Sequence, residues 1–370
     1  MGNNTLKRRI TNGNVAKNLL KQVNDMLTKS TAAENIYQTG METTTFNWQA
    51  MLNSTPNASF SPQNNSAKCY IVAKPTGRLG NQMFIYAATL GLAKFSGRIP
   101  VICPQKPSDI EQMISTFDLK GFHYNKSLCQ KLLSDGVLNI KERFCCRPDQ
   151  DLITSLKRVA CNNTVLISRY LQSYEYWLKI AEDIRKEFTC KQQYTKDSKQ
   201  IIEHLLSAKH LHVNDPQLHL VGIHARRGDF VSGKVRIPAT EEYLDQAIEY
   251  YHKTLANTSD HQSALMRFLN LNRNKTVVYI LVGDDPAWNS KYASTKHNVL
   301  TQKHIHSVGV DFCILQQCDG LIISTGTFGW WAGWLLNRTV IYERRQFKPP
   351  LSSQANQNLA GYIWPGWIPV

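Results

Sequence analysis

The sequence predicts an α/β fold in which strands alternate with helices and the strands form parallel sheets. Three observations lead to this fold class. Short apolar runs typical of buried strands alternate with stretches of helical periodicity. The same order recurs in both halves of the chain, with polar or glycine-containing turns between the elements. Polar motifs directly follow three of the predicted strands, which is where parallel sheets bind ligands.

The first predicted strand begins at Cys69 and runs over residues 69–73. A loop containing two glycines follows. The sequence then has helical periodicity over Asn81–Phe95 and a second strand-like run over Ile99–Cys103. Strand, glycine-containing turn, helix and strand in this order are the pattern of a βαβ unit. The N-terminal half is therefore predicted to contain a parallel sheet.

The second half of the chain repeats this order with clearer signals. Each predicted strand is a short, mostly apolar run, and three of them lead into a polar turn. The strands are predicted over residues 218–224, 276–282, 320–324 and 339–343, and the helices over 240–255, 311–319 and 328–336. This alternation implies a parallel sheet with helices on both faces.

Length and composition divide the chain into a tail and two domains. A chain of 370 residues is longer than a single core usually supports. Residues 1–67 are rich in Asn, Thr, Ser and Gln and contain no strand-like run, so we expect a flexible stem or a disordered tail. We expect the two domains to occupy residues 68–215 and 216–370.

The formal net charge of +15 favours an anionic partner: nucleic acid, an anionic membrane or a phosphorylated small molecule. A nucleic-acid-binding protein is expected to carry basic stripes interleaved with aromatic residues. Here the basic residues are spread along the chain and no nucleic-acid-binding module is visible. We therefore expect no nucleic-acid partner.

Two features bear on the compartment. Sequons for N-glycosylation, which is a modification of the secretory lumen, occur at Asn3, Asn53, Asn57, Asn64, Asn125, Asn162, Asn257, Asn274 and Asn337. The N-terminal residues contain neither a signal peptide nor an apolar run long enough to cross a membrane. We expect membrane association only through an anchor that is not visible in this sequence, and a soluble product is the alternative.

The nine cysteines are scattered and lack the paired clusters of a zinc site. If the chain is lumenal, we expect some disulfides and at least one unpaired thiol. The pairing we favour joins Cys145 or Cys146 to Cys161 or Cys190.

One short segment has the spacing of a metal site. Asp149-Gln150-Asp151 matches the Asp-x-Asp motif of many glycosyltransferases, but it follows Cys-Cys-Arg-Pro rather than a strand. Nothing in the sequence directs both carboxylates to a common ion, so we interpret the match as chance. We expect no metal and no cofactor.

The segment His224-Ala225-Arg226-Arg227-Gly228-Asp229 follows a predicted strand. Two arginines beside a glycine suit a diphosphate, because guanidinium groups bind phosphate oxygens in pairs and keep their charge. A surface ion pair between arginine and Asp229 is the alternative interpretation.

Two further segments have the composition of anion-binding turns. Ser324-Thr325-Gly326-Thr327-Phe328-Gly329 lies between a predicted strand and helix, where backbone amides bind anions, although helix capping explains its hydroxyls equally well. We expect the tryptophans that follow it, Trp330, Trp331 and Trp334, to pack in the core rather than stack on a sugar. Gly77-Arg78-Leu79-Gly80-Asn81-Gln82 is a glycine-rich turn that matches neither a P-loop nor a dinucleotide fingerprint.

Taken together, these segments resemble the motifs of the α-1,2-fucosyltransferases. His224–Phe230 is similar to the family's signature loop, and GRLGNQMF at Gly77–Phe84 is similar to its N-terminal motif. VGDDPAW at Val282–Trp288 and GTFGWWAGWL at Gly326–Leu335 resemble its middle and C-terminal motifs. Four motifs in the expected order make a specific match, which leaves residues 1–67 uncovered.

The resemblance implies the GT-B architecture, in which two Rossmann-like doubly wound halves face a cleft. It also implies an inverting, metal-independent transfer of L-fucose from GDP-fucose to the 2-hydroxyl of a galactose-terminated glycan. The N-terminal domain is then expected to lie on the acceptor side and the C-terminal domain to bind GDP-fucose. The family further implies a type II membrane protein of the Golgi lumen. A catalytically silent lectin-like relative is the alternative.

Without a metal, arginine side chains and helix dipoles have to stabilise the diphosphate. We expect Arg226 and Arg227 to do so, Arg226 foremost, with the Gly326-Thr327 turn assisting, and we expect Asp284 to meet the guanine or ribose. Asp229 is either the general base or a group that orients Arg226, and His224 either holds a phosphate or packs at the strand end. Asn81 resembles an asparagine that faces the sugar in related protein O-fucosyltransferases, and it is expected to position donor or acceptor.

The predicted catalytic residues are thus Arg226, Asp229 and Asn81. The predicted substrate-binding residues are His224, Arg227, Gly228, Asp284, Ser324, Gly326, Thr327, Phe328, Arg78 and Gly80.

Overall fold

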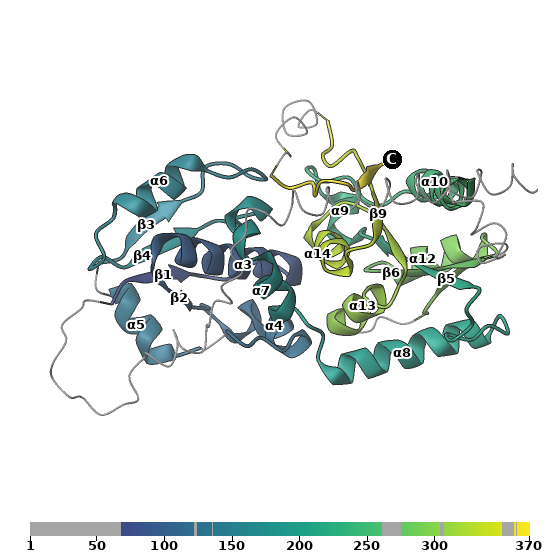
Figure 1. The fold of residues 1–370 in the computed structure, drawn as a ribbon, viewed down its shortest axis with the longest axis horizontal. Helices are drawn as coiled ribbons and strands as arrows, with labels where there is room; N and C mark the ends of the chain where they lie inside the picture. Colours follow the sequence, from purple (N-terminus) through teal and green to yellow (C-terminus); the bar gives the residue numbers. More distant parts are fainter. Residues whose placement is uncertain are drawn as a thin grey trace, which may run out of the picture. The chain divides into compact units, whose positions relative to one another are not determined.

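The computed structural model describes residues 68–121, 124–134, 136–260, 275–303, 307–349, 359 and 361–370. The predicted tail at 1–67 lies outside these residues. Within them the chain forms two parallel sheets, both flanked by helices (Figure 1). The expected α/β class, with one parallel sheet in each half, is confirmed.

The N-terminal sheet has four strands in the order β2-β1-β4-β3, and every neighbouring pair is parallel. Its strands are β1 (Tyr70–Ala73), β2 (Ile99–Ile102), β3 (Leu138–Lys141) and β4 (Val165–Ser168). The helices of this half are α3 (Leu79–Ser96), α4 (Glu111–Thr116), α5 (Lys126–Ser134), α6 (Gln150–Arg158), α7 (Ala181–Glu187) and α8 (Gln192–Ser207). Helix α3 makes the predicted crossover from β1 to β2.

The C-terminal sheet has six parallel strands in the order β10-β9-β8-β5-β6-β7. The strands are β5 (Leu218–Ala225), β6 (Thr276–Gly283), β7 (Val299–Thr301), β8 (Gly320–Ile323), β9 (Thr339–Tyr342) and β10 (Ile368–Pro369). The helices are α9 (Gly228–Ser232), α10 (Glu241–Asp260), α12 (Pro286–Ser294), α13 (Val308–Leu315) and α14 (Thr327–Leu336). From β5 the chain adds β6 and β7 on one side of the sheet and then β8, β9 and β10 on the other side. Ligands of doubly wound sheets bind where the strand order reverses in this way.

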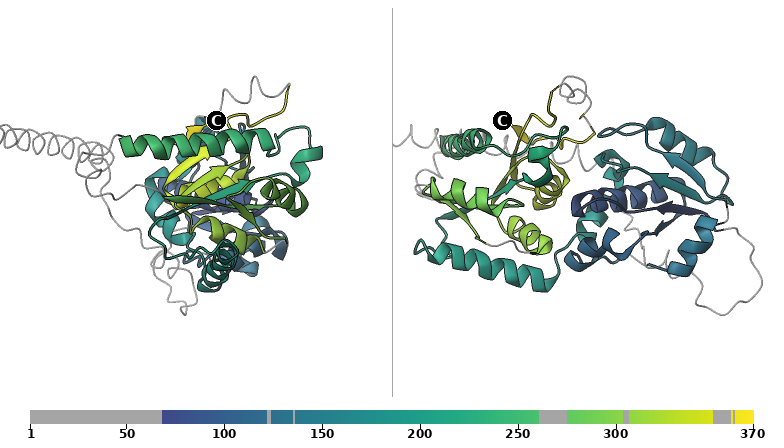
Figure 2. Two further views of the ribbon diagram at one scale, coloured as in Figure 1. Left: turned by 90° about the vertical axis from the view of Figure 1, so that its right-hand side faces the viewer. Right: turned by 180° about the vertical axis from the view of Figure 1, so that it is seen from behind.

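The two faces of the six-stranded sheet are covered by different helices. Tyr243 and Tyr251 of α10 pack on one face, together with Tyr292 of α12, against the odd-numbered side chains of β5 and β6. Helices α8 and α13 lie on the other face (Figure 2). Both faces are therefore apolar, and this accounts for the continuous hydrophobic runs that the sequence shows in these strands.

The predicted helix over 311–319 is wrong at both ends. Helix α13 begins at Val308, because the Ser307 side chain accepts a hydrogen bond from the Val310 amide and so caps the helix. The helix ends at Leu315, and the next residues form a turn that leads into β8. The prediction also gave no elements between 104 and 217 and did not include β7 or β10.

The predicted disulfide pairing is wrong. The structure pairs Cys69 with Cys161, Cys103 with Cys129, Cys145 with Cys146, and Cys190 with Cys313. Cys69 and Cys161 precede β1 and β4, which are neighbours in the sheet, and the linear sequence does not reveal that neighbourhood. Cys318 is the free, buried thiol.

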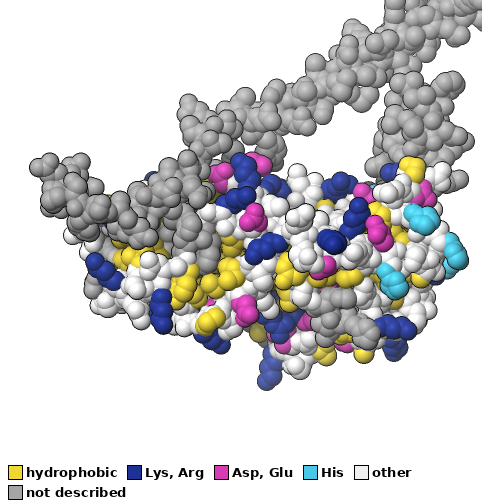
Figure 3. Space-filling view, turned by 90° about the horizontal axis from the view of Figure 1, so that it is seen from below, with side chains coloured by type: hydrophobic (Ala, Val, Ile, Leu, Met, Phe, Trp, Pro, Cys, Tyr) yellow, Lys and Arg dark blue, Asp and Glu magenta, His cyan; other side chains and the backbone are white. Residues whose placement is uncertain are grey.

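The surface of the described residues adds two observations. On the face drawn in Figure 3, the lysine and arginine side chains lie apart from one another, with acidic and uncharged side chains between them. Among the described helices, none has the length and apolar character to cross a membrane.

An aromatic cluster joins the two halves of the chain. Trp330, Trp331 and Trp334 of α14 are at most 1% exposed, so they pack in the core as predicted. Trp177, from the N-terminal half, stacks on Trp331 with ring centroids 5.1 Å apart and meets Trp334 edge-on at 4.7 Å. Phe84 of α3 lies 4.7 Å from the Trp330 ring.

We expect Trp177→Ala to lower the free energy of unfolding by about 3–5 kcal/mol, because it removes a buried indole from this contact between halves. Chemical denaturation monitored by circular dichroism measures the effect. The control is Phe95→Ala, which truncates an aromatic residue that is 39% exposed and should change stability by less than about 1 kcal/mol. Equal losses in the two variants would contradict this role for Trp177.

Candidate functional site

The site forms where β5 ends. Arg226 and Arg227 directly follow this strand and precede the short helix α9, which Gly228 opens. The Arg226 amide donates to Ser324 Oγ at 2.7 Å, so the ends of β5 and β8 are tied together. Arg227 donates from Nη1 to the Ala239 carbonyl at 2.6 Å, and its guanidinium lies over the Trp288 ring, 4.4 Å from the centroid.

Carboxylates hold both arginines in place. Arg226 donates through its two Nη atoms to Asp284 and Asp229. The Asp284 carboxylate also accepts from the Arg227 amide at 2.8 Å, and Arg227 Nε donates to Asp285 at 3.1 Å. A side chain at position 228 would clash with the Asp284 carboxylate, which explains the glycine there.

A third arginine reaches this group from the N-terminal half. Arg78 Nη1 lies 3.6 Å from Asp284 Oδ2 and 3.8 Å from Asp229 Oδ1, although its side chain is 64% exposed. Burial, and after it the charge of Arg78, lowers the pKa of Arg226, whereas Asp229 raises it. The structure thus brings Arg78, Arg226, Asp229 and Asp284 together, as the sequence predicts.

The N-termini of two helices meet beside these arginines. Gly80, at the start of α3, lies so close to α14 that a Cβ there would come within 2.6 Å of the Thr327 carbonyl carbon. Trp331 Nε1 donates to the Gly80 carbonyl at 3.1 Å. Gly326 precedes α14 with φ of 113°, a conformation that favours glycine. Both helices therefore direct their positive ends to the same region.

Asn81 connects the two helices. Its Oδ1 accepts hydrogen bonds from Thr327 Oγ1 at 3.0 Å and from Gln172 Nε2 at 2.8 Å. The predicted residues Asn81, Gly80, Gly326 and Thr327 therefore lie in one place, although about 250 residues separate the two motifs.

His224 and Phe328 lie under this region. The His224 ring is 4.9 Å from the Phe328 ring, and its Nδ1 is buried with no partner among the described residues. Burial, followed by the charge of Arg226, lowers the pKa of His224 to about 3, so the ring is neutral at physiological pH. His224 therefore packs at the end of the strand, which is one of its two expected roles. A neutral imidazole ring still has one N–H group that can donate to a ligand.

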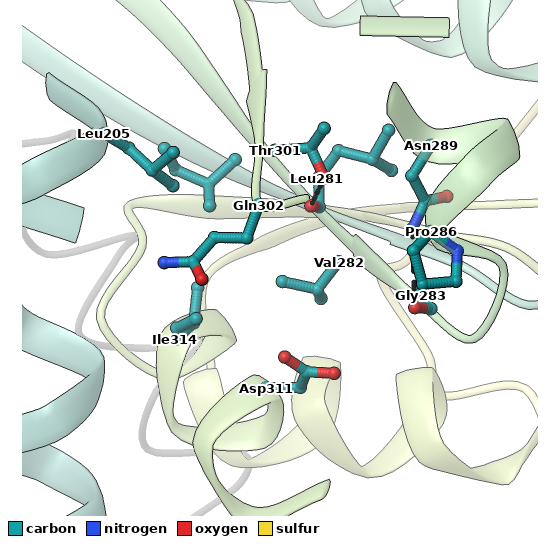
Figure 4. Close-up of a pocket in the computed structure, with 11 residues that line it drawn as sticks. Leu205, Leu281, Val282, Gly283, Pro286, Asn289, Thr301, Gln302, Asp311 and Ile314 are labelled. Carbon is teal, nitrogen blue, oxygen red and sulfur yellow. Dashed lines mark hydrogen bonds between the residues drawn. The ribbon is translucent and has the colours of Figure 1, made fainter. Parts of the chain in front are cut away.

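A pocket opens at the ends of β6 and β7 (Figure 4). Asp311 of α13 directs its carboxylate toward Val282 and Gly283, where β6 ends. Burial raises the pKa of Asp311 to about 7, and no described residue donates a hydrogen bond to its carboxylate. Asn289 Oδ1, in the same lining, is also buried without a described partner. The pocket is thus lined by two acceptor groups, the Asp311 carboxylate and Asn289 Oδ1, that have no hydrogen-bond donor among the described residues.

The sequence prediction did not select Asp311 and Asn289, which line this pocket. Each lies within a helix and belongs to no polar motif at a strand end, so the reasoning from strand ends passed over both. A weak signal existed in Asp311, which is the acidic residue in the otherwise apolar stretch Val308–Leu315.

Asp149 and Asp151 have a structural role. Asp149 is 1% exposed, accepts from the backbone amides of Asp151 and Leu152, and so caps α6. Both aspartates also pair with Arg143. Among the described residues, no group of three or more His, Cys, Asp and Glu side chains is arranged to hold a metal ion.

A buried carboxyl lies behind Gln172. Glu142 is 4% exposed, and it accepts hydrogen bonds from the Leu171 amide at 2.9 Å and from the Tyr176 hydroxyl at 3.1 Å. Burial raises the pKa of Glu142 from 4.5 to about 7, although both hydrogen bonds act in the opposite direction.

This shift predicts how stability depends on pH. The folded state binds the Glu142 proton more tightly than the unfolded state, so this stabilisation is complete below pH 4.5 and is lost as the pH rises to about 7. Relative to Glu142→Gln, the free energy of unfolding of the wild type should fall by roughly 2–3 kcal/mol over this window. Urea titrations at several pH values measure it.

The control is Glu175→Gln, which changes an exposed carboxyl in the same region of the chain. Its stability should follow the wild-type pH profile. Parallel profiles for the wild type and Glu142→Gln would mean that the folded state does not hold Glu142 in its protonated form.

Comparison with known proteins places this site in a family. The family model described as glycosyl transferase family 11 matches residues 38–357. The galactoside 2-alpha-L-fucosyltransferase SEC1 of Bos taurus is 25% identical over 72% of this chain, and the match spans 64% of that relative, less than two thirds of its length. The galactoside alpha-(1,2)-fucosyltransferase 2 of Mus musculus is 26% identical over 80% of this chain and 77% of the relative.

Solved structures also match this chain. NodZ from Bradyrhizobium is 15% identical, with a TM-score of 0.43 over 72% of this chain and 92% of that one. A mutant of Arabidopsis thaliana FUT1 in complex with GDP is 13% identical, with a TM-score of 0.45 over 80% and 74%. The family model covers most of the sequence, including all four motifs that form the site, and this chain belongs to glycosyl transferase family 11.

Proposed function

We propose that this protein transfers L-fucose from GDP-fucose to the 2-hydroxyl of a galactoside on a glycan. Family membership and the names of the relatives support the reaction class. The observation that carries the proposal is the convergence of Arg226 and Arg78 with the N-termini of α3 and α14, because this group suits a diphosphate leaving group.

The proposed reaction is an inverting displacement without a metal. The acceptor hydroxyl attacks the anomeric carbon of the fucose, the bond to the diphosphate oxygen breaks, and GDP leaves with the electron pair. Arg226, foremost, and the helix N-termini stabilise the charge that develops on GDP. Arg227 is held by Asp285 and Ala239, so it shapes the loop from which Arg226 extends.

Asp229 is suited to take the acceptor proton. Its Oδ1 makes the contacts with Arg226 and Arg78, and this leaves Oδ2 to accept from a hydroxyl. The two roles expected for Asp229, orienting Arg226 and acting as general base, are thus compatible in one carboxylate.

We assign the guanine base to the pocket around Asp311, which has a volume of about 20 Å³ and has to widen to admit the base. Guanine presents adjacent N1–H and N2–H donors, which a carboxylate accepts together. Asp311 and Asn289 Oδ1 are acceptors without described partners, whereas the Asp284 carboxylate is already engaged by arginines. We therefore assign the base to Asp311 rather than to Asp284.

A Golgi-lumenal location, with an anchor that this sequence does not show, completes the proposal. The disulfides support an oxidising compartment. The sequon residues Asn125, Asn162 and Asn337 are exposed, as glycosylation in that compartment requires.

The first test is transfer of labelled fucose from GDP-fucose to a panel of β-galactosides in the presence of EDTA. We expect EDTA-resistant transfer, and a loss of about 10²–10³-fold in kcat for Arg226→Ala, because a donor aimed at developing charge is removed. GDP binding by calorimetry should weaken in parallel.

The matched control is Arg338→Ala. It also removes an arginine–aspartate pair, with Asp319 at 2.8 Å, but this pair lies where β8 and β9 begin, at the opposite end of the sheet. Transfer by this variant should stay within about twofold of the wild type. Tight GDP binding without transfer to any acceptor would favour a lectin-like protein, and the absence of GDP binding would overturn the proposal.

The second test concerns the base. Asp311→Asn should weaken GDP binding about 10–100-fold and reduce the preference for GDP over inosine diphosphate, because it replaces one of the two acceptor oxygens with an NH₂ donor that faces a guanine N–H group. The wild-type dissociation constant for GDP should also rise as the pH falls from 8 to 6, because the pKa of Asp311 is about 7 and only the ionised carboxylate accepts both N–H groups.

Asp118→Asn serves as the control. This exposed aspartate pairs with Lys120 at 3.2 Å on the surface of the N-terminal half. It should leave both the GDP affinity and its pH dependence unchanged. If Asp311→Asn behaves in the same way, the base binds elsewhere.

A further inference from the structure

The side-chain amide of Asn81 is held in one orientation by two donors. Gln172 Nε2 and Thr327 Oγ1 both donate to Asn81 Oδ1, at 2.8 and 3.0 Å. Because both lone-pair positions of Oδ1 are used, the amide NH₂ group is directed away from these two residues. No described residue accepts a hydrogen bond from Asn81 Nδ2.

The free NH₂ group lies beside the glycine-rich turn. A Cβ at Gly77 would come within 2.6 Å of Asn81 Nδ2, so the glycine leaves this donor uncovered. Asn81 is in the first turn of α3 and Thr327 opens α14, where the helix N-termini face the arginines. The orientation thus adds a side-chain donor to the backbone amides that are already directed at the proposed diphosphate.

We propose that Gln172 is a positioning residue that orients the Asn81 amide so that Nδ2 donates to the sugar-phosphate part of the donor. Gln172 lies in a segment without a predicted motif, and among the described residues of the site Asn81 is its hydrogen-bond partner. This inference rests on the proposed function, because it requires a nucleotide-sugar at this place.

Gln172 is itself held firmly. It is 6% exposed, and its Nε2 donates to Asn81 Oδ1 at 2.8 Å. The preceding residues Arg169 and Leu171 have φ of 95° and 51°, conformations that are unusual for residues other than glycine. Glu142 accepts from the Leu171 amide at 2.9 Å and so stabilises this turn.

The direction of the Gln172–Asn81 hydrogen bond can be tested by substitution. In Gln172→Glu the donor becomes an acceptor of the same shape, which repels Asn81 Oδ1 and turns the amide around. Gln172→Leu removes the hydrogen bond alone. We expect kcat/KM for GDP-fucose to fall about 10–100-fold in Gln172→Glu and less in Gln172→Leu, measured at a temperature at which circular dichroism shows both variants folded.

The opposite arrangement, in which Asn81 donates to Gln172, predicts that Gln172→Glu retains activity. That result would overturn the proposal. The matched control is Gln316→Leu, which removes an amide hydrogen bond of 2.8 Å to the Ala332 carbonyl and does not involve Asn81. A loss in this control as large as that in Gln172→Leu would also overturn it.

A double-mutant cycle separates positioning from general structural damage. If Gln172 acts only through Asn81, then Gln172→Leu should cause no further loss of kcat/KM in an Asn81→Ala background. Additive losses would mean that Gln172 acts by another route. The GDP dissociation constants of the same four proteins provide a second reading of the cycle.

Failure of the inference and failure of the proposed function give different results. If the wild type neither binds GDP nor transfers fucose, the proposed function fails and the inference fails with it. If the wild type is active but the cycle is additive, or Gln172→Glu is as active as the wild type, only the role of Gln172 is overturned.

Discussion

The close contact between the N-termini of α3 and α14 is the feature on which the site depends. Gly80 and Thr327 approach so closely that a methyl group does not fit between them. This contact brings the positive ends of two helices together and places Asn81 beside Thr327. The aromatic cluster beneath it, with Phe84 and Trp177 against the tryptophans of α14, fixes the two helices relative to each other.

The contact also explains why one site draws residues from both halves of the chain. Arg78 lies immediately before α3, and its position follows from that of the helix. Arg226 comes from the end of β5, which Ser324 ties to β8, the strand that leads into α14. The elements of the site are thus connected through the Ser324 hydrogen bond and through the contacts between α3 and α14.

The sequence predicted the C-terminal sheet well because β5, β6 and β8 are buried on both faces and read as continuous apolar runs. It failed for β3, where Leu138 and Lys141 are exposed and the strand lies at the sheet edge. Motif reasoning selected Arg226, Asp229 and Asn81, since polar residues at strand and helix ends have a recognisable context. It did not select Asp311 and Gln172, because the roles proposed for them depend on neighbours that are distant in sequence.

The pairing of Arg78, Arg226 and Arg227 with Asp229, Asp284 and Asp285 has a consequence for ligand discrimination. An incoming anion has to compete with carboxylates that are tethered beside the arginines, at an effective concentration of millimolar or more. Free phosphate offers little beyond its charge and competes poorly under this condition. A nucleotide-sugar also has a base and a sugar whose contacts add to those of the diphosphate. The three aspartates therefore reduce the binding of simple anions more than the binding of a nucleotide-sugar.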